Sequence, residues 1–281
     1  MSFLISPERL IDELADDNLF LFDATFVLPT MQRDAAAEFE QTHIPNAQFF
    51  DINAVAAPDT DLPHMVPNAA DFQEMMRDFG LCQHHKIVIY DNSPFLSAAR
   101  AWWLLRLFGK DDVFVLDGGL PAYVTAGGKT THGPAKAKPT GDFTSGKSAS
   151  QLMLFDDLRK AVENKQGWQI LDARPAPRFA GTVPEPRAGL RSGHMPGAMN
   201  VPVTDLLNPV TGQMRPLDEI RTLFENAGLD FDKPAVTSCG SGVTAAGLTL
   251  ALAELGKFDI ALYDGSWAEW GASDAPIESD S

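Results

Sequence analysis

The stretch Ala235-Val-Thr-Ser-Cys-Gly-Ser-Gly-Val-Thr-Ala245 decides the fold of this chain. Its first four residues, Ala235–Ser238, form a short run that is typical of a buried strand. A glycine-rich turn follows, and from Thr244 to Leu255 apolar residues recur at helical spacing until Gly256, a residue type that commonly ends helices. A buried strand that leads through a tight turn into a helix is the building unit of a parallel α/β sheet.

The same succession of segments occurs twice along the chain. Phe20-Leu-Phe-Asp23-Ala-Thr matches Gln169-Ile-Leu-Asp172-Ala-Arg, and three further pairs follow in the same order, all of them 147 to 151 residues apart. The further pairs begin at Thr42 and Gly193, at Ile87 and Ala235, and at Leu116 and Tyr263. This period is far longer than that of a solenoid repeat, so the sequence predicts two homologous domains.

We therefore expect a noncatalytic α/β domain over residues 1–126, a linker over residues 127–149 and a catalytic domain over residues 150–281. The linker is rich in Gly, Pro, Thr and Lys and lacks apolar periodicity, and we expect it to drape over both domains. A helical pattern over residues 98–108, ahead of Gly109, is the counterpart of the helix that ends at Gly256. Each domain should hold a parallel sheet with helices on both faces, and such sheets bind ligands at the carboxyl ends of their strands.

The composition is that of a globular protein with a strongly acidic charge. Of the 281 residues 44% are hydrophobic and 21% are charged, and the net charge is −16. This charge repels phosphate, so we expect no nucleic-acid partner and no membrane partner, and an anionic substrate would need a local basic pocket. The first residues lack the basic region of a signal peptide. No apolar run approaches the ~18 residues of a membrane span. Two cysteines are too few for a disulfide framework in a protein of this size. We expect a cytoplasmic protein with reduced thiols.

Cys239 stands at the junction between the predicted strand and the glycine-rich turn. Gly240 and Gly242 allow the backbone to curl so that its N–H groups turn inward and form a nest that accepts an anion. The following helix adds the positive end of its dipole, and both effects favour a nucleophilic thiolate. The first half has Asp91 at the matching position, so we expect one active and one inactive copy, and a structural role for Cys82.

A cysteine on such a loop could also belong to a phosphatase. Those enzymes need Cys-x5-Arg, in which the arginine cradles the phosphate. Six residues after Cys239 stands Ala245, so the arginine is missing and the sequence disfavours phosphoryl chemistry.

Cys239-Gly-Ser-Gly-Val-Thr244 and Tyr263-Asp-Gly-Ser-Trp-Ala-Glu-Trp270 resemble the 3-mercaptopyruvate sulfurtransferases of the two-domain rhodanese family. The resemblance covers the whole chain and implies two tandem rhodanese-like domains. Further matching segments are His43-Ile-Pro-Asn-Ala, Phe49-Phe-Asp51, Leu62-Pro-His-Met65, Ala101-Trp-Trp103 and Asp172-Ala-Arg-Pro175.

The residues after the cysteine bear on the choice of sulfur donor. Rhodaneses that use thiosulfate carry Cys-Arg-Lys-Gly-Val-Thr in this loop, whereas Gly240 and Ser241 occupy the two basic positions here. Because thiosulfate is a dianion that needs nearby positive charge, the loop favours a monocarboxylate donor. A thiosulfate:cyanide sulfurtransferase and a persulfide relay loaded by a partner protein remain the alternatives.

The resemblance implies the chemistry and the groups that perform it. The Cys239 thiolate would take the sulfur of 3-mercaptopyruvate as a persulfide, release pyruvate, and pass the sulfur to a thiol, to reduced thioredoxin or to cyanide, with no metal or organic cofactor. The loop N–H groups would hold the anionic sulfur, and the loop residues implied are Gly240, Gly242, Val243 and Thr244.

Two arginines are implied as donors to the carboxylate and ketone of the substrate. They are Arg178 and Arg187, on a loop that prolines stiffen, and arginine suits the task because its guanidinium is planar and bidentate. Arg191 lies close in sequence and is the weaker alternative.

The resemblance also implies a proton relay of a serine, a histidine and an acid. Ser241 matches the serine and His64, from the inactive half, matches the histidine, but the position of the acid falls on Asn53. Asparagine cannot relay charge, although it can fix the tautomer of an imidazole. Asp59 and Asp61 are therefore the other candidates to support His64.

Several chemistry-bearing residues are better explained by structure. His43 and His194 precede proline at matching positions of the two halves, and Asp23 and Asp172 are paired in the same way, so neither pair distinguishes an active copy. We expect the histidines to cap turns. Trp102, Trp103, Trp267 and Trp270 are expected to pack in the core or between the domains, and His84-His85 to form a solvated turn rather than a metal site.

Overall fold

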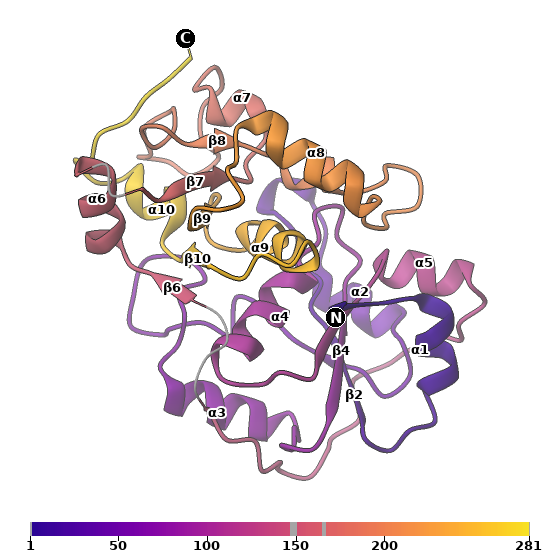
Figure 1. Cartoon of the computed structure of the whole chain (residues 1–281). Helices are drawn as coiled ribbons and strands as arrows, with labels where there is room; N and C mark the ends of the chain where they lie inside the picture. Colours follow the sequence, from indigo (N-terminus) through magenta and orange to yellow (C-terminus); the bar gives the residue numbers. More distant parts are fainter. Residues whose placement is uncertain (1, 147–150, 165–166, 281) are drawn as a thin grey trace. The chain divides into compact units, whose positions relative to one another are not determined.

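The computed structural model describes residues 2–146, 151–164 and 167–280, which fold into two α/β units (Figure 1). Unit 1 holds Met1–Ala57, Pro67–Ala149 and Asn208–Met214. Unit 2 holds Pro58–Val66, Ser150–Leu207 and Arg215–Ser281. Each unit thus includes one short segment from the other half of the sequence.

Each unit is built on a five-stranded parallel sheet. The strand order is β1-β5-β4-β2-β3 in unit 1 and β6-β10-β9-β7-β8 in unit 2, so the two orders are equivalent. This equivalence confirms the repeat that the sequence predicts. The strands are β1 Leu4–Ile5, β2 Leu19–Asp23, β3 Gln48–Phe49, β4 Lys86–Tyr90, β5 Val113–Leu116, β6 Gln151–Met153, β7 Gln169–Asp172, β8 Met199–Asn200, β9 Ala235–Ser238 and β10 Ile260–Tyr263.

Helices flank both sheets (Figure 1), which confirms the predicted fold class. Those of unit 1 are α1 Pro7–Glu13, the 3₁₀ helix η1 Pro29–Met31, α2 Ala35–Gln41, α3 Ala69–Asp78, α4 Ala98–Leu107 and α5 Gly119–Thr125. Those of unit 2 are α6 Phe155–Glu163, α7 Ala176–Phe179, the 3₁₀ helix η2 Val203–Leu206, α8 Leu217–Ala227, α9 Ala245–Glu254 and α10 Ser266–Trp270. Within the described residues, no helix has both the length and the apolar character that a membrane crossing requires.

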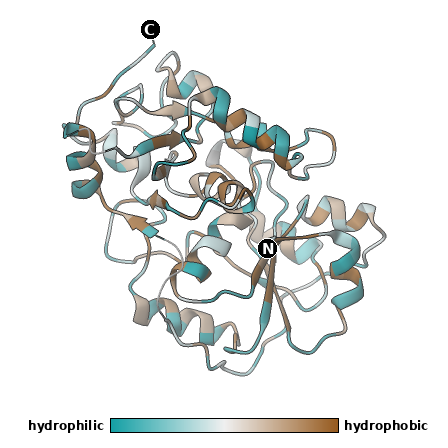
Figure 2. Cartoon of the chain, viewed as in Figure 1, coloured by the Kyte–Doolittle hydropathy of each residue, from teal (hydrophilic) through white to brown (hydrophobic). Residues whose placement is uncertain are grey.

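The helices that follow the central strands, α4 and α9, are largely buried. In α9 every residue from Ala245 to Ala253 is buried, whereas α8 alternates hydrophilic and hydrophobic residues along its length (Figure 2). A bond of 2.9 Å between the hydroxyls of Thr237 and Thr249 joins β9 to α9 and satisfies two polar groups in this core. A helix buried in this way has one fixed position, and it fixes the loop that precedes it.

Both of these helices end as predicted, at a glycine in the left-handed conformation. The φ angles are +85° at Gly109 and +81° at Gly256. In each case the next residue closes the last turn, since Lys110 N–H donates to Leu105 O and Lys257 N–H to Leu252 O, both at 2.9 Å. α4 is one residue shorter than the predicted pattern at its C-terminal end, and α9 is one residue shorter at each end, which is within the usual uncertainty of helix boundaries.

The polar segment after α5 follows unit 1 as far as residue 146. Phe143 is fully buried there, and its N–H donates to Leu81 O at 3.1 Å. Thr131, which lies in this segment, forms an isolated antiparallel bridge with His43. Residues 147–149 of the predicted linker lie outside the described residues.

Candidate active site

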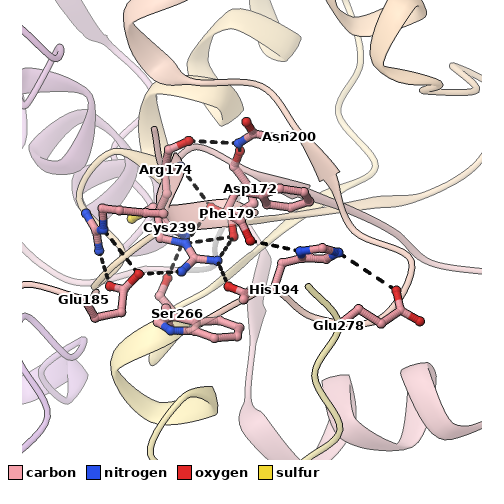
Figure 3. Close-up of polar contacts among 12 residues, drawn as sticks. Asp172, Arg174, Phe179, Glu185, His194, Asn200, Cys239, Ser266 and Glu278 are labelled. Carbon is pink, nitrogen blue, oxygen red and sulfur yellow. Dashed lines mark hydrogen bonds and ion pairs between the residues drawn. The ribbon is translucent and has the colours of Figure 1, made fainter. Parts of the chain in front are cut away.

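Cys239 is the residue that follows β9, and only 2% of it is exposed. The hydroxyl of Ser266, at the start of α10, holds the loop from behind. Its Oγ accepts the N–H group of Cys239 at 3.2 Å (Figure 3). The same Oγ accepts the N–H of Gly242 at 3.1 Å and donates to Tyr263 O at 2.9 Å. The position of the cysteine is therefore fixed by the neighbouring strand β10 as well as by its own.

The carbonyl groups of the loop are also engaged. Trp267 N–H donates to Cys239 O at 2.9 Å, and Ala268 N–H donates to Gly240 O at 3.0 Å. Gly242 has a φ of +78°, which lets the chain reverse direction before α9. Among the described residues, the backbone N–H groups without a protein acceptor in this loop are those of Gly240, Ser241, Val243 and Thr244. Together with the N-terminal end of α9, they form a place where an anion is favoured.

The structure brings three of the predicted residues together at the hydroxyl of Ser241. His64 Nδ1 lies 3.0 Å from Ser241 Oγ and 3.3 Å from Ser241 O. Arg187 Nη2 donates to the same Oγ at 3.4 Å. His64 and Ser241 are 7% exposed, so the contact is shielded from water. The segment that carries His64 belongs to unit 2, although it comes from the first half of the sequence.

Arg178 lies beside Gly240 of the loop, as Arg187 does, and is held by Glu185. Glu185 is buried, and its carboxylate binds Arg178 Nη2 at 2.5 Å and Arg174 Nη1 at 2.9 Å (Figure 3). Arg174 is itself buried against Asp172 at 2.7 Å, with its guanidinium 4.2 Å from the ring of Trp267. Burial alone would lower the pKa of Arg174, but the two carboxylates outweigh burial and raise it.

The charges of this cluster leave one cation in excess. Arg174, Arg178 and Arg187 carry three positive charges, and Asp172 and Glu185 carry two negative charges. Burial lowers the pKa of Arg187, and the charge of Arg178 adds to this effect, whereas Cys239 and Glu185 oppose it. The site can therefore balance one anion, either a thiolate or a monocarboxylate, within a chain whose net charge is −16.

The sequence did not single out Arg174, Glu185 or Ser266. Their signals were present, because Arg174 lies in Asp172-Ala-Arg-Pro175, and Glu185 comes two residues before Arg187. Ser266 has a φ of +50°, a left-handed conformation that is uncommon for serine. In the first half the matching residue is Gly119, with a φ of +60°, so this exchange of glycine for serine was the visible sign.

Arg191, the weaker alternative, is engaged elsewhere. Its guanidinium donates to three backbone carbonyls, those of Trp270 at 3.2 Å, Gly271 at 3.3 Å and Ala275 at 2.8 Å. These bonds attach the chain after α10 to the loop of residues 180–198, which is a structural role.

The paired histidines have the same geometry in both units. His43 Nδ1 lies 2.7 Å from Phe39 O and its ring stacks on Phe39, while His194 Nδ1 lies 2.9 Å from Phe179 O and stacks on Phe179 (Figure 3). Each ring caps the end of a short helix, α2 or α7, which confirms the predicted structural role.

The tryptophans and the remaining histidines also have structural positions. Trp267 and Trp270 belong to the buried core of unit 2, and Trp102 and Trp103 are buried as well. His85 Nδ1 accepts the N–H of Cys82 at 2.9 Å and so closes a turn. Across residues 2–146, 151–164 and 167–280 there is no group of three or more His, Cys, Asp or Glu side chains that could hold a metal ion.

Comparisons with known proteins agree with this architecture. A model of the rhodanese-like domain matches residues 6–126 and again residues 154–273. The chain belongs to the rhodanese family. It is 39% identical over 279 residues to the 3-mercaptopyruvate sulfurtransferase of Escherichia coli K12, which covers 99% of this chain and 98% of the relative.

Two further comparisons give the range of activities among these rhodaneses. The crystal structure of SseA from Escherichia coli, which represents the 3-mercaptopyruvate sulfotransferases, matches with a TM-score of 0.86 at 38% identity over 96% of this chain and 100% of that chain. A mitochondrial thiosulfate/3-mercaptopyruvate sulfurtransferase of Arabidopsis thaliana is 35% identical and covers 98% of this chain and 78% of its own length.

Proposed function

We propose that this rhodanese is a sulfurtransferase that takes sulfur from 3-mercaptopyruvate through a persulfide on Cys239. The observation that carries the proposal is the meeting of His64 and Arg187 at the hydroxyl of Ser241, two residues after the buried cysteine. The near-full-length similarity to proteins named for this activity supports it.

The reaction consists of two displacements at sulfur. The Cys239 thiolate attacks the sulfur of the donor, so an S–S bond forms and the C–S bond breaks. The electron pair of that bond leaves on the carbon as the enolate of pyruvate, which then takes up a proton. An acceptor thiolate attacks the outer sulfur of the persulfide and regenerates the Cys239 thiolate, so the kinetics are of the ping-pong type.

The donor carboxylate is bound by the single excess cation. Arg187 is half-buried and donates to the neutral hydroxyl of Ser241, so a carboxylate gains a charge-assisted bond there. Arg178 is held by Glu185 and presents its remaining donors in a fixed orientation. Gly240 leaves space for these groups, because a Cβ at that position would lie 3.3 Å from Arg178 Nη2 and 3.8 Å from Arg187 Nη1.

The persulfide is stabilised by the loop backbone. The N–H groups of Gly240, Ser241, Val243 and Thr244 are the donors proposed for the outer sulfur. Gly242 contributes through its backbone conformation, since its N–H already donates to Ser266. The contact of 3.0 Å between His64 and Ser241 provides a path by which the hydroxyl gives its proton to the enolate and regains one from the imidazole.

The proposed acceptor is a thiol, either a small cytoplasmic thiol or reduced thioredoxin, with cyanide as an artificial substitute. None of these steps uses a metal or an organic cofactor. Of the three residues considered as support for His64, Asp59 and Asp61 are exposed, and Asn53 donates its N–H at 2.9 Å and its Nδ2 at 3.0 Å to Asp51 Oδ1.

The test is the intact mass of the protein after incubation with 3-mercaptopyruvate or with thiosulfate. We expect a gain of one sulfur atom, about 32 Da, in the wild type and in the Cys82→Ser control, and no gain in Cys239→Ser. Loading should be faster from 3-mercaptopyruvate. Faster loading from thiosulfate would make the chain a thiosulfate sulfurtransferase, and no loading from either donor would leave a relay that a partner protein loads.

A further inference from the structure

Asp264 is a buried carboxylate that the proposed reaction does not use. It follows β10, two residues before Ser266, and is 1% exposed. Its Oδ2 accepts the backbone N–H of Val66 at 2.6 Å, a short distance that is typical of a charge-assisted bond. Val66 is the last residue of the segment 58–66 that unit 2 takes from the first half of the sequence.

This segment carries His64 and has an irregular backbone. It contains no helix or strand, and residues 58–61 are exposed. His64 has a φ of +62°, a left-handed conformation that costs about 1–2 kcal/mol for a residue with a Cβ. An anchor two residues further along the chain is placed to hold the backbone in this unfavourable conformation.

The first half of the chain contains a twin of this anchor. Asp117 follows β5 as Asp264 follows β10, and Asp117 Oδ1 accepts the N–H of Met214 at 2.7 Å. Met214 is the last residue of segment 208–214, which unit 1 takes from the second half of the sequence. Each of the two aspartates therefore binds the backbone of a segment from the other half of the sequence, but only the segment held by Asp264 carries a residue of the proposed site.

We propose that Asp264 is a positioning residue, which places the imidazole of His64 at Ser241 by holding the backbone of Val66. This inference rests on the proposed function, because it is the proton transfer through His64 that would need the placement. Two residues that follow β10 thus bind two parts of the proposed site. Asp264 accepts the N–H of Val66, in the segment that carries His64, and Ser266 accepts the N–H of Cys239.

The test compares Asp264→Ala and Asp264→Asn with the matched control Asp117→Ala, with and without His64→Ala. We expect Asp264→Ala to reduce kcat for pyruvate release about tenfold, the order of a partial loss of acid–base catalysis, and to leave KM unchanged because Arg187 stays in place. Asp264→Asn should recover most of the rate, since its amide oxygen can still accept the Val66 N–H. Asp117→Ala should keep the wild-type kcat.

Two further measurements separate positioning from a general disturbance. The double variant Asp264→Ala, His64→Ala should be no slower than His64→Ala alone, because both changes remove the same group. Alkylation of Cys239 by iodoacetamide should proceed at the wild-type rate in Asp264→Asn. An equal loss of kcat in Asp117→Ala, an additive double variant, or an unchanged kcat in Asp264→Ala would each overturn the proposal.

Hydrogen exchange keeps this inference separate from the proposed function. Asp264→Ala should lose amide protection in the peptide that contains Val66, and Asp117→Ala should lose it only around Met214. Unchanged protection at Val66 would overturn the anchor even if the enzyme is active. A wild type that releases no pyruvate from 3-mercaptopyruvate would refute the proposed function, while the exchange experiment would still decide whether Asp264 holds the segment.

Discussion

Asp91 occupies in unit 1 the position that Cys239 occupies in unit 2, and its substitution by asparagine should change how stability depends on pH. Asp91 is 5% exposed, and its carboxylate accepts the N–H of Ala98 at 2.6 Å and the hydroxyl of Ser97 at 3.1 Å. Burial outweighs these bonds and raises the pKa of Asp91 from 3.8 to about 6.

The size and sign of the effect follow from this shift. A shift of about two pKa units corresponds to about 3 kcal/mol. Between pH 4 and pH 6 the folded protein keeps a proton on Asp91 that the unfolded chain has released, so the free energy of unfolding falls as the pH rises. The contribution of the protonated carboxyl is complete below pH 4 and is lost above pH 6. Asparagine carries no such proton and should show no such fall.

The assay is urea unfolding of the wild type and Asp91→Asn at intervals from pH 4 to pH 8. The stability of the variant relative to the wild type should rise by about 3 kcal/mol across this range, with the midpoint between the two pKa values. Asp17→Asn, which changes an exposed carboxyl of the same unit, serves as the control and should track the wild type. A constant difference between Asp91→Asn and the wild type across the range would refute the burial argument.

Two predictions concern substrate binding. Arg187→Ala should raise KM for 3-mercaptopyruvate about 10- to 100-fold, the loss expected for one charge-assisted hydrogen bond. Arg191→Ala, the control, should lower Tm with little change in KM. Steady-state kinetics of both variants test this, and a wild-type KM in Arg187→Ala would remove Arg187 from the site. Gly240→Ala should raise KM severalfold at nearly constant Tm, because the new Cβ would stand 3.3 Å from Arg178 Nη2 and must displace it. An unchanged KM in that variant would mean that Arg178 does not need its present position.

The repeat made most of the fold predictable from the sequence. The matched strands indicated that both halves have the same strand order, since a repeated half folds twice in the same way. Gly109 and Gly256 marked both helix ends, because a left-handed residue closes each of them. Cys239 was predictable for a local reason, since a strand, a glycine turn and a helix are all continuous in sequence.

The parts that could not be predicted depend on contacts between segments far apart in the chain. The exchange of Gly119 for Ser266 marks the position, but it does not reveal that Ser266 binds the backbone of Cys239, because that bond depends on the register between β9 and β10. The role of Glu185 was hidden for the same reason, as it joins Arg174 to Arg178 only after the loop between α7 and β8 has folded back. His64 was reached by resemblance alone.

The two units differ at more positions than the one where Asp91 stands in place of Cys239. In unit 1 the Asp91 carboxylate accepts the N–H of Ala98 and thereby occupies the N-terminal end of α4 with an anion of the chain itself. The next strand supplies Gly119, where a Cβ would lie 2.2 Å from Asp91 O, so no side chain can hold that loop from behind.

Unit 2 differs at both of these positions. Ser266 reaches the N–H groups of Cys239 and Gly242, and the end of α9 is left to an anion from outside the chain. A cysteine at position 91 would also stand between a strand and a helix. It would lack the serine that binds the loop of unit 2, the arginines beside that loop and the segment that carries His64. The proposed sulfur transfer therefore draws on the loop, its anchor and the segment from the first half of the sequence, and unit 2 brings all three together.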